Sequence, residues 1–197
     1  MIEWLHGVEL ALFHLGNQMF ANPIGDAVFP VITSREYFIP IYGAVLLGLL
    51  IFGKKRGVLT VVFLALTITL SDQLAASVIK PMVGRLRPCH ALEGVRLLVD
   101  CGSGKSFPSA HAVNNFAAAM LAGHFYKKAA PYLFIYAGLV AFSRVYVGVH
   151  YFSDIIAGSL IGIAVAGCVI LLYELLQKYV SFMRLSPQKA QGTSTGA

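Results

Sequence analysis

The chain has 197 residues, of which 57% are hydrophobic and only 12% are charged, and its mean hydropathy is +0.73. This composition excludes an ordinary soluble domain, and the length is that of a single domain. The formal net charge of +6 does not indicate a nucleic-acid partner, because the basic residues are scattered between apolar runs. Basic residues placed in this way set the orientation of a membrane protein or hold an anionic ligand.

Residues 1–34 are predicted to form an amphipathic helical region that lies at the membrane interface. The apolar stretch 1–20 is interrupted by two glutamates and two histidines, which disfavours a membrane crossing. Trp4, Val8 and Leu12 can share one face of a helix, as expected for a helix that lies in the plane of the interface. The alternative is one further crossing built from this region.

Five later segments are long and apolar enough to cross a bilayer, which takes about 20 residues of helix. The predicted spans are 37–53, 57–80, 109–126, 129–147 and 152–177. We therefore predict an all-α, polytopic membrane helix bundle over 35–180, with five transmembrane helices, or six if the N-terminal region adds one. Pro81 disfavours helical geometry at the residue before it, so Lys80 is expected at the end of its helix. The polar residues 181–197 are predicted to be a disordered tail.

The basic segments predict the orientation of the bundle. Segments 54–56 and 127–128 and the chain after Lys178 fall on one side by alternation, and the positive-inside rule makes that side cytoplasmic. The loop 81–108 and the turn 143–153 then share the outer side. We expect a multi-pass protein of the inner (plasma) membrane, with the active site facing the periplasm or the exterior.

The predicted outer loop has an unusual composition for its side of the membrane. Its basic residues, which break the positive-inside rule and indicate a functional need for cations, are Arg85, Arg87, Arg96 and Lys105. Cys89 and Cys101 also lie in this loop, and in an oxidising compartment they are candidates for a disulfide. The alternative is two free thiols.

Three stretches on the outer side, "KPMVGRLRP", "SFPSAH" and "SRVYVGVHYFSD", carry groups suited to binding phosphate. Arginine and lysine are the usual side chains that hold phosphate oxygens, and a helix N-terminus offers backbone N–H groups to the same anion. The candidate phosphate-binding residues are Lys80, Arg87, Ser109, Ala110 and Arg144.

Two histidines and an aspartate add reactive groups to this cluster. His150 and Asp154 are four residues apart and share a helix face if the helix begins at or before His150. A carboxylate bonded to one imidazole nitrogen fixes the tautomer and leaves the other nitrogen to attack, while His111 can protonate a leaving oxygen. A His–Asp pair also suits a metal, but the outer loops offer only Glu93 and Asp100 besides it, and three cations would repel a metal. We therefore expect no metal and no cofactor.

The order and spacing of these residues resemble the three signatures of the type 2 phosphatidic acid phosphatase superfamily, also called lipid phosphate phosphatases. The signatures are a Lys, six residues and Arg-Pro; then Pro-Ser-Gly-His; then Ser-Arg, five residues, His, three residues and Asp. The matching residues are Lys80, Arg87-Pro88, "PSAH" at 108–111, Ser143-Arg144, His150 and Asp154. The one departure is Ala110 in place of the usual glycine, and an alanine keeps the backbone N–H.

The resemblance implies hydrolysis of phosphomonoesters or diphosphates, usually on lipids, without a metal. It implies that His150 becomes transiently phosphorylated and that His111 protonates the leaving group. It also assigns phosphate binding to the positions of Lys80, Arg87, Ser109 and Arg144. The family includes soluble vanadium haloperoxidases, but the hydropathy of this chain disfavours that branch.

The implied partners are the lipid bilayer and a lipid phosphate, with no nucleic acid and no oligomeric state indicated. Undecaprenyl diphosphate is the favoured substrate, because that carrier is recycled on the outer face. The alternatives are phosphatidylglycerophosphate, phosphatidate and lipid A phosphates. An interpretation from a different class is an anion transporter or channel. It would need polar residues along several spans, whereas here they cluster near one surface, with Asp72 as the main exception.

Some features inside the spans have a structural interpretation. Asp72 is expected to form a structural hydrogen bond, and Asn114 and Asn115 are expected to bond between helices. The spacing of Gly158 and Gly162 predicts close helix packing inside the bundle.

Overall fold

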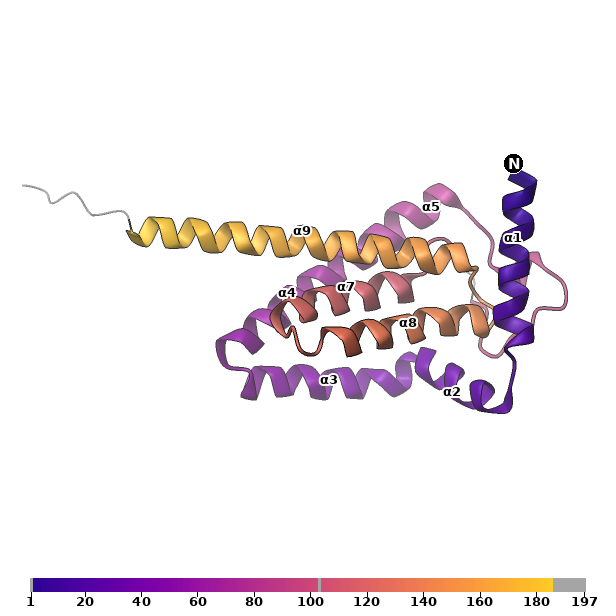
Figure 1. Cartoon of the computed structure of the whole chain (residues 1–197), viewed down its shortest axis with the longest axis horizontal. Coiled ribbons are helices and arrows are strands. Elements are labelled where there is room, and N and C mark those ends of the chain that lie inside the picture. The colour runs from indigo at the N-terminus through magenta and orange to yellow at the C-terminus, as the bar shows by residue number, and fades with distance from the viewer. Residues whose placement is uncertain (1, 103, 186–197) are drawn as a thin grey trace, which may run out of the picture.

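Helices, and no strands, form in residues 2–102 and 104–185, the part of the chain that the computed structural model describes. They are α1 (Ile2–His14), the π-helical η1 (Leu15–Met19), α2 (Pro23–Thr33), α3 (Arg35–Phe52), α4 (Lys54–Gln73), the π-helical η2 (Leu74–Ile79), α5 (Lys80–Val83), α6 (Pro88–Ala91), α7 (Ala110–Phe125), α8 (Ala130–Tyr146) and α9 (Phe152–Leu185). The long helices run side by side, and α1 stands across one end of them (Figure 1). The predicted all-α class is confirmed.

Helix α7 is the centre of the bundle, because it contacts α4, α8 and α9. Glycines let α9 approach it closely. A Cβ at Gly158 would lie 2.8 Å from the carbonyl oxygen of Ser109, and one at Gly162 would overlap the carbonyl oxygen of Val113. The prediction of close packing at this glycine pair is therefore confirmed. The contact also brings the start of α9 against the start of α7, which are the two segments that carry the predicted catalytic groups.

The helix that begins with α4 does not end at Lys80. Its main chain passes through η2 and α5 and ends at Val83, where Gly84 adopts a positive φ of 64°. The expectation that Pro81 ends the helix at Lys80 is therefore wrong. The wide π-helical turns of η2 come directly before this proline, and such turns are a common way for a helix to absorb a break in its hydrogen-bond ladder.

Two helical segments, Lys54–Ala91 and Phe152–Ser181, are long and apolar enough to cross a membrane. A third would be formed by Pro23–Thr33 and Glu36–Phe52 together, which meet at an angle of 57°. These segments support a membrane protein, while the count of five or six crossings stays a prediction.

The ends of the chain differ from the predicted organisation. Helix α9 continues to Leu185, so the first residues of the predicted tail are helical, and residues 186–197 lie outside the described residues. The N-terminal region is helical as predicted, but it is packed into the bundle. The side chain of Phe13 is fully buried against Tyr151 and Ala112.

Buried hydrogen bonds fasten this N-terminal region to the loop between α6 and α7 and to the end of α8. Asn17 is fully buried, and its amide donates to the carbonyl oxygens of Arg96 and Tyr146, both at 2.8 Å. Gly148 makes the close approach feasible, because its φ is 89° and an added Cβ would lie 2.8 Å from the Arg96 carbonyl oxygen. Residues 2–34 therefore form one wall of the bundle's end.

The two ends of the bundle carry different connections (Figure 1). The loop from α5 to α7 and the turn from α8 to α9 lie at the end where α1 stands. The short connections around Lys54 and Lys127 lie at the opposite end. This arrangement agrees with the alternation that the sequence predicted.

Candidate active site

The predicted nucleophile and its aspartate meet at the start of α9, but not as neighbours on one helix face. His150 precedes the helix, which begins at Phe152, so the condition for a shared helix face is not met. Asp154 instead closes the first turn of α9 by accepting the backbone N–H of Tyr151 at 2.9 Å, as an acidic side chain does in a capping box. The same carboxylate oxygen lies 3.2 Å from Nδ1 of His150.

Both side chains of this pair are buried, and this sets the charge state of the imidazole. The exposed fraction is 2% for His150 and 0% for Asp154. Burial lowers the pKa of His150 to about 4, and the charges of Arg144 and Arg87 add to this, while the Asp154 carboxylate opposes it. His150 is therefore neutral at pH 7. Because Nδ1 donates to a carboxylate, Nε2 is the nitrogen with a lone pair.

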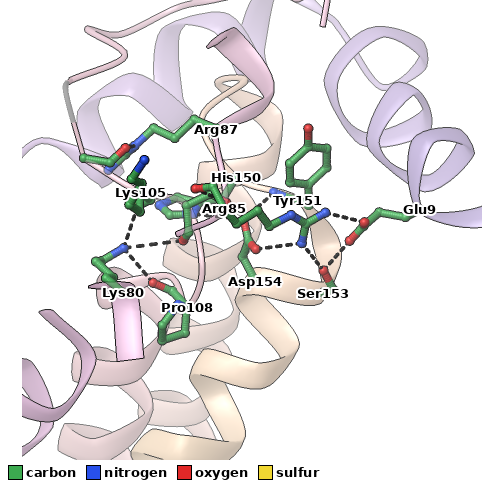
Figure 2. Close-up of polar contacts among 12 residues, drawn as sticks. Glu9, Lys80, Arg85, Arg87, Lys105, Pro108, His150, Tyr151, Ser153 and Asp154 are labelled. Carbon is green, nitrogen blue, oxygen red and sulfur yellow. Dashed lines mark hydrogen bonds and ion pairs between the residues drawn. The ribbon is translucent and has the colours of Figure 1, made fainter. Parts of the chain in front are cut away.

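The other oxygen of Asp154 contacts Arg85, a residue to which the sequence assigned no specific role. Arg85 Nη1 donates to Asp154 Oδ1 at 3.0 Å and to Ser153 Oγ at 2.7 Å. Its Nη2 forms an ion pair with Glu9 of α1, and its guanidinium lies 3.9 Å from the centre of the Tyr151 ring (Figure 2). Sequence reasoning missed this role because the spacing within "KPMVGRLRP" does not show which of the two arginines faces Asp154. It missed Glu9 because that residue is distant in the sequence from the other site residues.

Lys80 and Arg87 lie on the opposite side of His150 from Glu9 (Figure 2). Lys80 Nζ donates to the carbonyl oxygens of Lys105 and Pro108, both at 2.8 Å. Arg87 Nε donates to the carbonyl oxygen of Gly104 at 3.0 Å. Both cations thus border the segment that leads into α7.

Ser109 lies where this segment becomes α7, and it differs from the expectation in one respect. Its backbone N–H donates to the Asp154 carbonyl oxygen at 3.1 Å. This N–H is therefore not available to a phosphate, contrary to the prediction. Its hydroxyl is buried and has no hydrogen-bond partner among the described residues. Ala110 begins α7, and a first-turn N–H has no acceptor inside its own helix.

His111 and Arg144 both contact Thr33, the last residue of α2. His111 Nε2 lies 3.3 Å from the Thr33 carbonyl oxygen, and Arg144 Nη1 bonds the Thr33 hydroxyl. A carbonyl oxygen only accepts, so His111 Nε2 carries a proton in this arrangement. Thr33 is buried, and no feature of the sequence indicated that it would lie beside His111 and Arg144.

The outer loop is closed by a disulfide between Cys89 and Cys101, whose Cα atoms are 6.3 Å apart. His90 Nε2 lies 3.2 Å from Cys101 Sγ and 2.9 Å from the Gly102 carbonyl oxygen. Cys89, His90 and Cys101 are close enough together to suggest a metal site. The disulfide takes both sulfurs, so they offer no thiolate ligand.

Asp72, the one carboxylate deep inside a predicted span, is accounted for by a structural contact. Its Oδ1 accepts a hydrogen bond of 3.0 Å from Asn114 Nδ2. This bond joins α4 to α7 and confirms the predictions for Asp72 and Asn114. Asn115 instead donates to the His111 carbonyl oxygen at 2.9 Å, inside its own helix.

Comparison with known proteins identifies the family. A family model described as the PAP2 superfamily matches residues 58–178. Lipid A 4'-phosphatase of Bacteroides thetaiotaomicron is 35% identical over 170 residues, which cover 82% of this chain and 75% of that protein. Undecaprenyl-diphosphatase of Sulfolobus acidocaldarius is 35% identical over 166 residues, which cover 79% of this chain and 74% of that protein.

A solved structure agrees with these matches. The crystal structure of Aquifex aeolicus LpxE superposes with a TM-score of 0.68 at 30% identity, covering 83% of this chain and 94% of that one. The matched family region contains all three stretches that form the site. The chain therefore belongs to the PAP2 superfamily, and it is a membrane phosphatase that hydrolyses phosphoric esters.

Proposed function

We propose that the protein is a lipid phosphatase that works through a phosphohistidine on His150. The observation that carries this proposal is the buried contact between His150 Nδ1 and Asp154, together with the lowered pKa of His150. A neutral imidazole with Nδ1 bound to a carboxylate presents Nε2 as a nucleophile. Membership of a phosphatase family favours this hydrolase over an anion transporter or channel.

The groups around His150 suit a phosphate. Lys80 and Arg87 donate to neutral carbonyl oxygens, so their positive charges stay available to an anion. The buried hydroxyl of Ser109 has no partner in the described chain, and a phosphate oxygen would satisfy it. We assign the phosphate to these three residues, to Arg144 and to the N–H of Ala110.

The reaction then proceeds in two displacements. His150 Nε2 attacks phosphorus, a P–N bond forms, and the bond from phosphorus to the lipid oxygen breaks. That oxygen keeps the electron pair and takes the proton from His111, whose ring exchanges the Thr33 carbonyl for the substrate. Water next attacks the phosphohistidine and gives a proton to His111. The P–N bond breaks, and inorganic phosphate leaves.

Metal dependence and vanadate inhibition test this mechanism. The charge of the phosphoryl group is balanced by protein cations, so we expect phosphate release to be unaffected by EDTA. Vanadate can adopt the pentacoordinate geometry of the transferring group and should inhibit. Activity that is lost on chelation and restored by Mg²⁺ would contradict the proposal.

For the substrate we propose a phosphate on a lipid of the outer leaflet. The sequence alone favoured undecaprenyl diphosphate, and the relative from Sulfolobus acidocaldarius named undecaprenyl-diphosphatase supports it. The relative named lipid A 4'-phosphatase matches a slightly larger share of this chain, which supports a lipid A phosphate as the first candidate. Phosphatidylglycerophosphate and phosphatidate are the remaining alternatives.

A panel of these four lipids decides among them. Purified protein in detergent is given each lipid at equal concentration, and the initial rate of phosphate release gives kcat/KM. The physiological class should exceed the others by at least about tenfold, because head-group contacts made in the transition state raise kcat/KM. Equal values for all four would contradict a dedicated lipid substrate.

We further propose that the site faces the outside of the inner membrane. The support is that the basic connections lie at the end of the bundle opposite the site. A cysteine replacing the exposed Glu93, in a Cys168→Ser background, should react with an impermeant thiol reagent on intact cells with a permeable outer envelope. Labelling only after lysis would overturn this orientation.

A further inference from the structure

Both carboxylate oxygens of Asp154 accept hydrogen bonds. A simple histidine–aspartate pair needs only the oxygen that faces His150. Oδ2 accepts from His150 Nδ1 and from the Tyr151 N–H. Oδ1 accepts from Arg85 Nη1 at 3.0 Å. With both oxygens bonded, the carboxylate cannot rotate without losing at least one charge-assisted hydrogen bond.

Arg85 is itself fixed by groups from two distant parts of the chain. Glu9 of α1 binds its Nη2, and Ser153 accepts from its Nη1 while also bonding Glu9. The Tyr151 ring covers the face of the guanidinium. The exposed fractions of the Arg85 and Glu9 side chains are 24% and 18%, so this ion pair is largely withdrawn from solvent.

The charge balance separates Arg85 from the cations assigned to the phosphate. Two carboxylates, Asp154 and Glu9, neutralise Arg85. Lys80 and Arg87 bond main-chain carbonyl oxygens and form no ion pair within the described residues. A phosphate would therefore have to displace a carboxylate to bind Arg85, whereas it can approach the other two cations directly.

We infer that Arg85 is a positioning residue for His150, acting through Asp154, and that Glu9 makes the N-terminal helix α1 part of the active site. This inference rests on the proposed role of His150. Arg85 fixes the plane of the Asp154 carboxylate, and that plane fixes the imidazole whose Nε2 must point at phosphorus. Loss of Arg85 therefore slows phosphoryl transfer to the enzyme without weakening substrate binding.

The chain offers a matched control in the same loop. Arg96 forms an ion pair with Asp26 and lies 5.1 Å from the centre of the Tyr146 ring. Like Arg85, it pairs with a carboxylate of the N-terminal region and lies against a tyrosine ring. Unlike Arg85, it has no contact with Asp154. Arg96→Gln reports what a merely structural arginine of this loop contributes.

The test compares Arg85→Gln, Arg85→Lys, Glu9→Gln and Arg96→Gln as purified full-length proteins. The probes are p-nitrophenyl phosphate and phosphatidate, with kcat and KM measured for each and ³²P-labelling rates measured in a single turnover. Arg85→Gln should lower kcat and the labelling rate by about 10- to 100-fold, the effect of losing a charge-assisted hydrogen bond, with KM changed by less than about threefold.

The other variants sharpen the assignment. Arg85→Lys should recover part of kcat, and Glu9→Gln should lower kcat by a smaller factor. Combined with Arg85→Gln, Glu9→Gln should have no further effect, because both act through one chain of contacts. Arg96→Gln should keep kcat within about twofold, because the ion pair and ring contact of Arg96 do not reach Asp154. If Arg85→Gln does not fold, Glu9→Gln and Arg85→Lys still test the inference.

Two results would overturn it. A raised KM with unchanged kcat in Arg85→Gln would make Arg85 a substrate-binding cation. An equal loss of kcat in Arg96→Gln would make the effect structural. Either can occur while ³²P is still trapped on His150, so failure of this inference is distinguishable from failure of the proposed mechanism, in which no label is found on His150.

Discussion

The two ends of the bundle satisfy their polar groups in different ways. At the end that holds the site, Asn17, His150 and Asp154 are buried, and Asn17 and Asp154 are bonded to residues far away in the sequence. At the opposite end, Lys55 and Lys127 are exposed. Buried groups with fixed partners form a preorganised polar environment, whereas solvated cations only bias the orientation of the chain in the membrane.

A surface hollow lies at the end of the bundle away from the site, where the charged side chains are exposed. A cavity of about 460 Å³ lies between α4, α7 and α9 at the end away from the site, lined among others by Lys55, Arg56, His124 and Glu174. Arg56 stacks on Tyr126 at 5.6 Å from the ring centre. We attach no chemistry to this hollow, because its charges are carried by exposed side chains. The fixed, desolvated groups at the other end are therefore what mark the candidate site.

The largest expected effect comes from removing the buried nucleophile. His150→Ala should lower kcat by about 10⁴-fold or more and abolish any acid-labile phosphoenzyme, as loss of a nucleophile does in other covalent enzymes. Asp154→Asn should keep substrate binding but lose much of the rate, because the imidazole loses its orienting anion. Rapid-quench trapping of ³²P on each variant tests both. A phosphoenzyme that persists in His150→Ala, or label found on His111, would show that the two roles are reversed.

The next largest effect concerns the proposed acid. His111→Ala should lower the rate on a lipid phosphate by about 10²- to 10⁴-fold, the usual contribution of general acid catalysis. A p-nitrophenolate leaving group needs less help from a proton, so the loss should be smaller on p-nitrophenyl phosphate. The ratio of the two kcat values measures this difference. Equal losses on both substrates would argue against His111 as the acid.

The buried environment of His150 predicts an unusual pH dependence. A histidine with an ordinary pKa near 6.5 would lose its neutral form about 30-fold by pH 5. Because burial lowers the pKa of His150 to about 4, its neutral form should still dominate at pH 5. Nitrogen-detected NMR of the imidazole rings in detergent, assigned with His150→Gln, follows this titration. A His150 signal that titrates at pH 6 or above would contradict the buried, neutral nucleophile.

The smallest effect is expected at the end away from the site. Arg56→Gln removes a cation and its contact with Tyr126, which should change kcat and KM by less than about twofold, as for most exposed substitutions. Steady-state assays beside Arg85→Gln give the comparison directly. A tenfold change in kcat from Arg56→Gln would break the distinction between the two ends.

The long helices and most residues of the candidate site could be predicted from the sequence. Long apolar runs leave few options but helices in a membrane, so the predicted spans coincide with α3, α4, α7, α8 and α9. Rules based on neighbouring residues in the sequence were less successful where the packing of helices decides the local geometry. The helix continues through η2 and past Pro81 to Val83, and α9 begins only at Phe152, so His150 and Asp154 meet across a turn and not on one helix face.

The helical class and the three stretches of catalytic and phosphate-binding candidates follow from the amino-acid sequence, because apolar length and the spacing of charged groups are local properties of the chain. The positions of Glu9, Thr33 and Arg85 beside these candidates depend on the folded structure. Their contacts span 68 to 144 residues of chain. A pairing over such a separation depends on how α1 and α2 pack across the end of the bundle, and no periodicity in the sequence reports that packing.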